Sequence, residues 1–290
     1  MRIAGDGLGD VLLIDVVRGL ANGKALDLED ARAILKYNYN IKGSDDIRQV
    51  KGSDIVVVTA GLARKPGMSR EELLAKNAQI LKDVCLNVKE LAKDAIVIIV
   101  TNPLDIMTLY ALKATGFKPQ KLFGMGISLD TARFANLIAQ DLGLMCTDIE
   151  ALVIGSHGEG MMPLAGFTKV KGVLLDKFMD EDKIKSLVSR TVGRGAEIVA
   201  NLGTGSAFFA PSAAIAAIVR AVVKDEKRVI GLCSYLNGEY GIKDTCIGVP
   251  CRLGKDGIEQ VIELELSREE KAKLNKSAML VAQAAAQLLA

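Results

Sequence analysis

The sequence has 290 residues, 50% of them hydrophobic and 25% charged, so it can bury the cores of about two domains and is neither disordered nor collagen-like. Its formal net charge of +2, from 37 basic and 35 acidic side chains, favours no nucleic-acid partner, because such a partner usually requires a basic stripe. With 28 glycines and only 4% aromatic residues, the composition suits an α/β protein with tight turns.

Cysteine usage and the N-terminal pattern indicate a reduced, cytoplasmic location. The five cysteines are odd in number and form no CxxC pair, so we expect neither a disulfide framework nor a metal site. The N-terminus has no signal-peptide pattern. The longest uncharged stretch, 198–219, contains Pro211 and several glycines, so it predicts a helix end, a loop and a second buried helix, and no membrane partner.

Apolar runs and helical segments alternate in the first part of the chain. Three runs lack the two-residue alternation of a half-exposed sheet, which predicts buried parallel strands at 11–17, 55–59 and 95–100. The clearest helix between them covers 71–91, and Ser69 opens it with Glu72 three residues on, the spacing of a capping box. This alternation predicts a doubly wound α/β domain with a parallel sheet over residues 1–126.

The pattern changes beyond residue 127. Helices are predicted at 128–140, at 181–201 and, after a capping box of Ser267 and Glu270, at the C-terminal end. The predicted strands between these helices are short, at 151–155, 169–175, 228–235, 246–253 and 257–266. Strands grouped between helices predict an α+β second domain over residues 127–290.

The only histidine of the sequence, His157, follows the predicted strand 151–155 and lies between Gly155 and Gly158. Glycines let the backbone turn sharply, and a histidine just past a strand end can face a cleft. Its usual pKa near neutrality suits proton transfer. An ordinary hydrogen-bonded loop histidine would occupy the same kind of position, so both interpretations stay open at this point.

Asp130 and Arg133 are three residues apart in the predicted helix 128–140, so they share one helix face. Asp130 could orient an imidazole and stabilise its cation. Arg133 could hold a carboxylate through two parallel N–H bonds. An ordinary surface ion pair has the same spacing and is the alternative.

A basic loop, residues 61–70, joins the strand 55–59 to the capped helix. It carries Arg64, Lys65 and Arg70 beside proline and glycine, so it could close on an anionic ligand. Arg70 falls in the first helical turn, where the helix dipole disfavours a cation, so a helix-stabilising role explains it poorly. A solvated basic loop is the alternative.

Polar residues also follow two of the predicted parallel strands. The carboxyl ends of such strands are where doubly wound sheets bind ligands. Asn102 follows the strand 95–100, and a buried asparagine there could donate and accept hydrogen bonds at once. Asp15 lies at the end of the strand 11–17, where a carboxylate could accept bonds from a ribose diol.

Taken in chain order, these segments resemble the lactate/malate dehydrogenase family over most of the sequence, from about Gly9 to the C-terminus. The loop text ARKPGMSR is more similar to the malate branch than to the lactate branch. The segments that carry the resemblance are VTAGLARKPGMSR (58–70), IVTNPLD (99–105), LFGMGISLDTARF (122–134), IGSHGEG (154–160) and SAFFAPSAA (206–214).

The resemblance implies a role for each catalytic and substrate-binding residue. His157 would be the proton donor and acceptor, and Asp130 its orienting carboxylate. Arg133 would bind the C1 carboxylate of the substrate. Arg70 would polarise the reacting carbonyl, Arg64 would bind the second carboxylate that malate has and lactate lacks, and Asn102 would bond the substrate oxygen.

The resemblance also implies NAD as cofactor and residues 1–126 as the domain that binds it. Asp15 would hold the adenosine ribose and favour NAD over NADP. Asn77, seven residues beyond Arg70 and thus on the same helix face, would contact the cofactor. The remaining cofactor contacts that the family implies lie at the strand ends, at Thr59, Ala60, Gly61, Val100 and Asn102.

Two features depart from the family pattern. Ser156 and Glu159, on either side of His157, are mild variants of acidic positions in the family. The larger departure is at the N-terminus, where the family has a strand, a G-x-G-x-x-G turn and a helix before its ribose-binding acid. Asp15 is only six residues past Gly9, so about 20 residues of that plan, including the glycine fingerprint, are absent from the sequence.

The resemblance implies an NAD-dependent malate dehydrogenase, an enzyme of the tricarboxylic acid cycle, whose partners are its dicarboxylic substrate and its own copies in a homotetramer. A lactate dehydrogenase is the alternative within the family. A non-catalytic remnant that has lost cofactor binding is the alternative from another class. An NAD-using glycosidase of related fold would need metal-ligating residues, and the sequence has no such cluster around His157.

Overall fold

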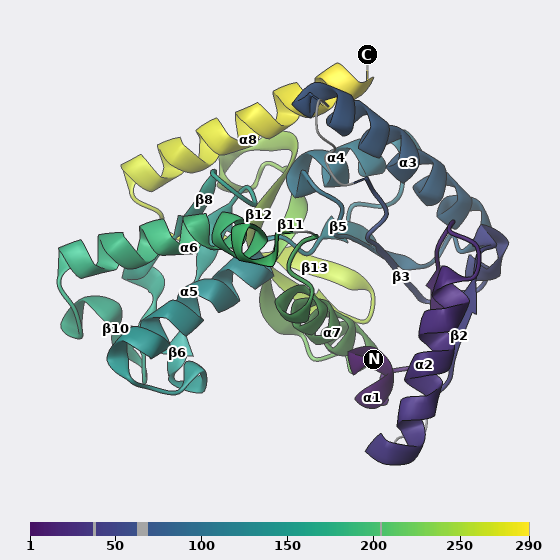
Figure 1. Cartoon of the computed structure of the whole chain (residues 1–290). Helices are drawn as coiled ribbons and strands as arrows, with labels where there is room; N and C mark the ends of the chain where they lie inside the picture. The colour runs from purple at the N-terminus through teal and green to yellow at the C-terminus, as the bar shows by residue number, and fades with distance from the viewer. Residues whose placement is uncertain (37–38, 63–68, 204, 290) are drawn as a thin grey trace.

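The computed structural model describes residues 1–36, 39–62, 69–203 and 205–289, and strands alternate with helices in its first half (Figure 1). The predicted helix 71–91 is confirmed, with both hydrogen bonds of its capping box between Ser69 and Glu72. The elements are α1 (Arg2–Gly5), β1 (Val11–Ile14), α2 (Leu20–Leu35), β2 (Ile41–Ser44), η1 (Ile47–Val50), β3 (Ile55–Val58), α3 (Arg70–Leu91), β4 (Ile96–Ile99), α4 (Leu104–Thr115) and β5 (Leu122–Gly124).

The three predicted parallel strands exist, but each is shorter than its apolar run. β1 ends at Ile14 rather than at residue 17, because the chain turns there: the Asp15 carboxylate accepts a hydrogen bond from the backbone N–H of Val17 at 3.0 Å. The hydrophobic pattern therefore located the strands correctly and overestimated their lengths.

The second half carries the predicted helices and most of the predicted strands, but the predicted strand 257–266 ends at Val261. The stretch 198–219 is indeed a helix end, a loop and a second helix, and no helix in the described part of the chain is long and apolar enough to cross a membrane. The elements are α5 (Ile127–Leu142), η2 (Cys146–Asp148), β6 (Ile149–Glu150), β7 (Val153–Gly155), β8 (Met161–Pro163), η3 (Ala165–Phe167), β9 (Lys169–Val170), β10 (Val173–Leu174), η4 (Leu175–Lys177), α6 (Glu181–Leu202), α7 (Phe209–Val223), β11 (Arg228–Asn237), η5 (Glu239–Gly241), β12 (Lys243–Gly254), β13 (Gly257–Val261) and α8 (Arg268–Leu289).

The predicted strand 169–175 is wrong as a single strand. β9 and β10 pair with each other in antiparallel fashion. Lys171 and Gly172 between them both have positive φ, 49° and 81°, as the two-residue turn of a tight hairpin requires. The turn at Lys171 and Gly172 therefore divides the predicted strand into two short ones.

One eight-stranded sheet unites the two halves of the chain. Its order is β3-β4-β5-β11-β12-β7-β8, with β13 also paired to β12. β3, β4 and β5 are parallel, and the later strands are antiparallel to their neighbours. The two parts join at the pair of Gly124 with Cys233, where a Cβ on Gly124 would lie only 2.6 Å from the Thr108 hydroxyl. This architecture confirms the predicted fold class.

β1 and β2 form a separate two-stranded parallel sheet. β1 pairs only with β2, and β3 only with β4, so each has one edge without a backbone partner in the described residues. All four residues of β4 are buried, whereas those of β1 and most of those of β3 are partly exposed. In the described residues no backbone ladder therefore joins β1 and β2 to the large sheet.

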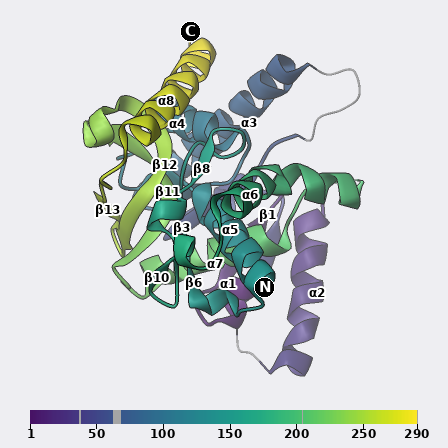
Figure 2. The same ribbon diagram turned by 90° about the vertical axis from the view of Figure 1, so that its left-hand side faces the viewer.

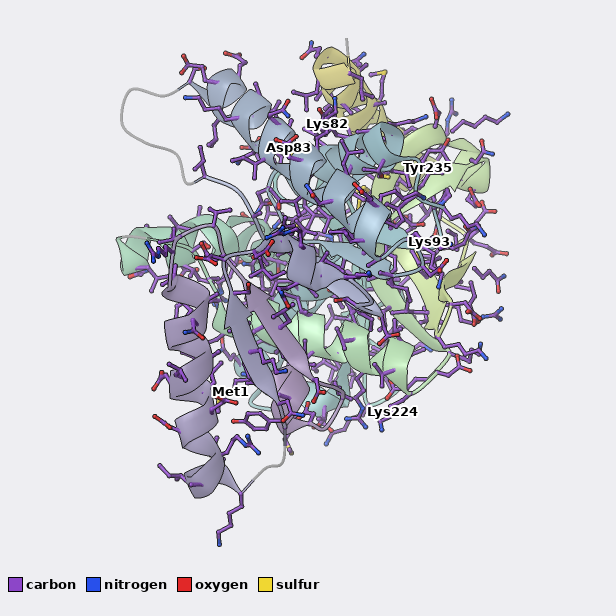
Figure 3. The ribbon with its side chains drawn as sticks, turned by 90° about the vertical axis from the view of Figure 1, so that its right-hand side faces the viewer. Met1, Lys82, Asp83, Lys93, Lys224 and Tyr235 are labelled. Atoms are coloured by element: carbon purple, nitrogen blue, oxygen red, sulfur yellow. The ribbon has the colours of Figure 1, made fainter. Side chains whose placement is uncertain are left out.

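Helices cover both faces of the large sheet. α3, α4 and α8 lie on one side, and α7 with the short α1 on the other (Figure 1). α2 lies at the outside of the molecule next to β1 and β2 (Figure 2). Charged side chains such as those of Lys93 and Lys224 project into solvent around the sheet (Figure 3). The candidate site lies at the carboxyl ends of the parallel strands and in the β7–β8 turn.

Candidate active site

His157 lies in the turn between β7 and β8. Gly155, which ends β7, has φ +93°, and a Cβ there would lie 2.3 Å from the carbonyl oxygen of Gly160. Only glycine fits this close approach of the two arms of the turn. The hydroxyl of Ser277 on α8 also bonds the turn, at 2.8 Å from the Ser156 hydroxyl. The position of the imidazole is thus set by two strands and a helix.

The imidazole Nδ1 of His157 lies 2.7 Å from the Asp130 carboxylate. Asp130 comes from the first turn of α5 and its side chain is 0% exposed, while that of His157 is 18% exposed. The bond to Asp130 engages Nδ1 and leaves Nε2 as the nitrogen available to a substrate. The structure therefore brings together the histidine and the carboxylate that the sequence analysis paired.

Arg133 completes this cluster from the next turn of α5. Its Nη1 donates to the second oxygen of Asp130 at 3.0 Å, and its side chain is 11% exposed. The terminal nitrogens lie 3.6 and 3.8 Å from where a Cβ on Gly195 would be, an ordinary van der Waals distance, so α6 packs beside the guanidinium. This is a buried pair rather than the ordinary surface ion pair of the alternative.

The surroundings of His157 act on its pKa in both directions. Burial lowers the pKa, the hydrogen bond and the charge of Asp130 raise it, the charge of Asp105 raises it further, and the charge of Arg133 lowers it. The net pKa lies above its usual value, so the protonated imidazole is favoured. The stability that this pair contributes is present below the unfolded-state pKa and is lost as the pH rises through the folded-state pKa.

Asp105, a residue that the sequence analysis did not single out, lies beside this cluster. It is buried in the first turn of α4, and one of its oxygens accepts the backbone N–H of His157 at 2.7 Å. Burial raises the pKa of Asp105 to about 6, against the lowering effects of the Cys233 thiol and of His157. A signal was present in the sequence: a carboxylate lies three residues after the strand-end Asn102, in the first turn of an otherwise apolar helix.

The ends of β3 and β4 lie side by side. The hydroxyl of Thr101, just past β4, donates to the carbonyl of Ala60, just past β3, at 2.7 Å. Thr59, Gly61 and Asn102 are exposed along this edge, and Ala60 and Val100 are partly buried. The expectation of a buried Asn102 is therefore wrong, because the chain leaves the sheet at this residue and its side chain reaches solvent.

Asn77 on α3 holds the start of the basic loop. Its side-chain oxygen accepts the backbone N–H of Leu62 at 2.7 Å, and its amide group donates to the Leu62 carbonyl at 3.4 Å. Arg70 is the first residue of α3, so it does share that helix with Asn77. Arg64 and most of the loop, 63–68, lie outside the described residues.

Asp15 follows β1 at the carboxyl end of the parallel strands, where it is partly buried. One of its oxygens accepts the Val17 N–H, and the carboxylate has a further oxygen for a ribose hydroxyl. Asp15 and the residues 59–61 and 100–102 all lie at or just past the carboxyl ends of parallel strands, the place where doubly wound sheets bind ligands, although Thr101 itself is buried.

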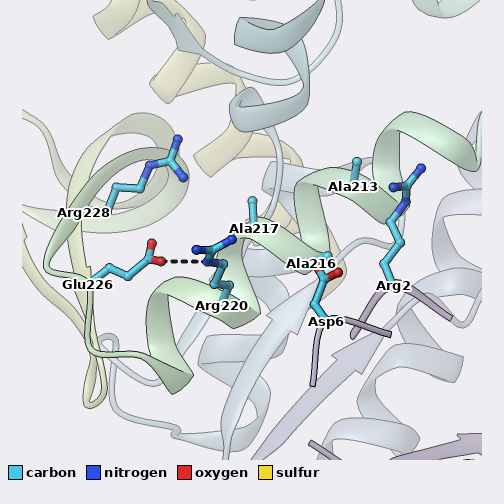
Figure 4. A pocket seen from close by; sticks show the side chains of 8 residues that line it. All are labelled: Arg2, Asp6, Ala213, Ala216, Ala217, Arg220, Glu226 and Arg228. Atoms are coloured by element: carbon cyan, nitrogen blue, oxygen red, sulfur yellow. Dashed lines mark hydrogen bonds and ion pairs between the residues drawn. The ribbon is translucent and has the colours of Figure 1, made fainter. Parts of the chain in front are cut away.

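A pocket of about 360 Å³ lies elsewhere, between α1 and α7 (Figure 4). Arg220 in its wall pairs with Glu226 at 3.0 Å. None of the predicted site residues belongs to the lining, which consists of Arg2, Asp6, Ala213, Ala216, Ala217, Arg220, Glu226 and Arg228. The candidate active site is therefore the His157 cluster and not this pocket.

Two family models match the chain and divide it close to the predicted domain boundary. The lactate/malate dehydrogenase NAD binding domain matches residues 1–124, and the lactate/malate dehydrogenase alpha/beta C-terminal domain matches residues 127–288. The malate dehydrogenase of Methanosarcina mazei is 49% identical over 269 residues, which are 93% of this chain and 88% of that protein.

Solved structures agree in fold with both branches of that family. The malate dehydrogenase of Cryptosporidium parvum is 37% identical with a TM-score of 0.95, over 99% of this chain and 93% of its own. The lactate dehydrogenase of the same organism, solved with lactic acid and NAD, is 36% identical with a TM-score of 0.94, over 99% and 92%. Overall fold alone therefore does not separate the two substrates.

Proposed function

This chain belongs to the lactate/malate dehydrogenase family, and we infer that it is an enzyme that catalyses the NAD-dependent, reversible oxidation of malate to oxaloacetate. The relatives at 43–49% identity over most of the chain are malate dehydrogenases, which supports malate over lactate. The observation that carries the chemistry is the His157–Asp130–Arg133 cluster, held in one buried group by α5 and the β7–β8 turn.

We propose that His157 is the general acid and base. In oxaloacetate reduction, its Nε2 donates a proton to the carbonyl oxygen as the carbonyl carbon receives a hydride; malate oxidation reverses both transfers. NADH, when bound, supplies the hydride. Asp130 holds Nδ1 and stabilises the imidazolium, which favours the protonated acid that oxaloacetate reduction needs. Closure of the basic loop, residues 61–70, over the bound anions would exclude water and so strengthen the arginine contacts to the substrate.

The substrate contacts are part of the same proposal. Arg133 would bind the C1 carboxylate, Arg70 would polarise the carbonyl as the loop closes, and Asn102 would bond the substrate oxygen and help seat the nicotinamide. The support for Arg133 is its position beside Asp130, with the guanidinium mostly buried. The support for Asn102 is its exposure at the strand edge.

The cofactor contacts follow the exposed edge of the parallel strands. NAD would lie with its adenosine ribose at Asp15 and its nicotinamide end at Thr59, Ala60, Gly61, Val100 and Asn102. The Asn77 side chain would act here by fixing the backbone of Leu62, because it is already engaged with that residue. Residues 1–126 would form the NAD-binding domain and residues 127–290 the substrate domain.

Substrate choice tests the function directly. The wild-type enzyme is expected to reduce oxaloacetate with a higher kcat/KM than pyruvate. In Arg64→Gln the kcat/KM for oxaloacetate, but not that for pyruvate, is expected to fall roughly 10²- to 10³-fold, because the charged partner of the second carboxylate is removed. Steady-state assays with both keto acids and NADH measure this. Lys65→Gln, in the same loop, is the control.

Each alternative function predicts a different result, one in these assays and one in an NADH-binding measurement. A preference of the wild type for pyruvate would show a lactate dehydrogenase and contradict the role of Arg64. A titration of NADH fluorescence with the folded protein tests the other alternative. If the protein causes no saturable change in this fluorescence, it is the non-catalytic remnant that lacks a cofactor site.

We also propose that the chain assembles into a homotetramer. Large apolar side chains lie exposed on α2 and at the start of α7, with Ile34 82% and Phe209 72% exposed. Large apolar side chains exposed on a helix are suited to contacts between copies of the chain, because such a contact removes them from water. Light scattering is expected to give four times the chain mass of 30.9 kDa, and a monomer mass would contradict the proposal.

A cytoplasmic location and a role in the tricarboxylic acid cycle complete the proposal. All five cysteines are free in the structure, and four are buried, which suits a reducing compartment. Cell fractionation followed by a malate-oxidation assay tests the location, and enzyme activity confined to an extracellular or membrane fraction would contradict it.

A further inference from the structure

Asp105 is a buried carboxyl group for which the mechanism above has no use. It is 3% exposed, and its oxygen Oδ1 has no hydrogen-bond partner among the described residues. Burying such a group without full hydrogen bonding is unfavourable, so a carboxyl group at this position calls for a physical reason.

Three separate elements converge on this carboxyl group. Asp105 itself lies in the first turn of α4, where the helix dipole favours an anion. Its Oδ2 accepts the backbone N–H of His157 in the β7–β8 turn at 2.7 Å. The fully buried thiol of Cys233, on β11, is a weak donor that also lowers the pKa of the carboxyl group. The Asp105 carboxyl group on α4 therefore contacts both the β7–β8 turn, which carries His157, and β11 in the large sheet.

We propose that Asp105 is a second positioning residue of the acid/base site: its buried carboxylate fixes the peptide of His157 and, with Asp130, stabilises the imidazolium. Asp130 holds the ring at Nδ1 from one side, and Asp105 holds the backbone of the same residue from α4. This inference rests on the proposed acid/base role of His157.

His157 and Asp105 are each faced by titratable or charged groups from several neighbouring elements. His157 is faced by Asp130 and Arg133 of α5 and by Asp105 of α4. Asp105 is faced by His157, Asp130 and the thiol of Cys233, which in turn is next to Cys246 on β12. Two carboxylates and one guanidinium therefore act on the imidazole, and removal of either carboxylate is expected to make its cation less stable.

Since His157 is the only histidine of the sequence, its titration can be followed as a single signal. In protein labelled with ¹³C-histidine, Asp105→Asn is expected to lower the pKa of His157 by roughly 0.5–1 unit, and Asp130→Asn by more. The asparagine keeps an acceptor for the His157 N–H and removes only the charge. In the same variant the pH profile of kcat/KM should move to lower pH by the same amount, with the KM for NADH unchanged.

Thermal stability gives a second measurement that does not depend on turnover. The folded-state pKa of Asp105, about 6, lies above its ordinary value of 3.8, so ionisation disfavours the folded state. As the pH rises from about 4 to about 6, the wild type should lose stability relative to Asp105→Asn, and above that range the difference should be constant.

Matched cysteine variants test the Cys233 contact. Cys233→Ser offers the Asp105 carboxylate a stronger donor and should lower the Tm less than Cys85→Ser, which places a hydroxyl in an apolar part of the core on α3. Equal losses of Tm in the two variants would overturn the contact.

The outcomes separate this inference from the proposed function. An Asp105→Asn protein that folds and keeps the wild-type pKa of His157 would overturn the inference and leave the malate dehydrogenase proposal in place; a loss of Tm without a change in pKa would show a merely structural role. A wild type that titrates as expected but turns over no malate would contradict the proposed function instead.

Discussion

Replacing His157 with glutamine is expected to lower kcat for oxaloacetate reduction by roughly 10²- to 10⁴-fold, the range that a positioned general acid contributes. Glutamine has a similar size and can keep a hydrogen bond to Asp130, but it carries no proton that can be transferred near neutral pH. NADH binding should be unchanged, because the His157 turn lies outside the strand edge assigned to the cofactor. Stopped-flow or steady-state kinetics with NADH fluorescence separates the two effects.

The same turn offers a control for this substitution. Glu159 is exposed two residues away, and Glu159→Gln should leave kcat within about twofold of the wild type. A His157→Gln enzyme with wild-type turnover would remove the basis of the proposed mechanism. A loss shared equally by Glu159→Gln would show that the turn, rather than the imidazole, is what matters.

The second large effect is expected at Arg133. Arg133→Lys keeps the charge but loses the planar fork that can bond Asp130 and a substrate carboxylate at the same time. We expect kcat/KM for oxaloacetate to fall roughly 10²- to 10³-fold, mainly through KM, because a bidentate, largely buried contact is lost. The KM for NADH should stay within about twofold of the wild type.

Arg194→Lys is the matched control for Arg133→Lys. Arg194 lies on α6 and pairs with the exposed Glu197 at 2.9 Å, an ion pair that contributes little to stability. Its substitution should change neither kcat nor KM by more than about twofold. If Arg133→Lys behaved in the same way, the substrate carboxylate would have to bind elsewhere.

The elements that depend on short stretches of chain could be predicted well. The capping boxes at Ser69 and Ser267 formed as expected, because their hydrogen bonds join residues three positions apart. The pairing of Asp130 with Arg133 was predicted for the same reason, since three residues on a helix define one face. Gly155 beside His157 likewise marked a turn that only glycine fits.

Features set by distant contacts were predicted less well. The hairpin of β9 and β10 is a local feature that was nevertheless missed, because Lys171 and Gly172 inside the predicted strand 169–175 form a two-residue turn that was not recognised. Asn102 was expected to be buried, but its exposure depends on how the chain leaves β4. Asp105 was overlooked, because its importance comes from a hydrogen bond to a residue 52 positions away.

The α/β alternation, the helix starts, the glycine-flanked histidine and the residues able to carry acid/base chemistry could be recognised from the order of residues alone, because each follows from propensity, periodicity or local hydrogen bonding. Long-range contacts were needed to join both halves through one mixed sheet, to place β1 and β2 in a separate sheet, and to bring Asp130, Arg133 and Asp105 together around a single histidine. Burial makes that difference, because a carboxylate withdrawn from water changes the pKa of its neighbour far more than the same residue would at the surface.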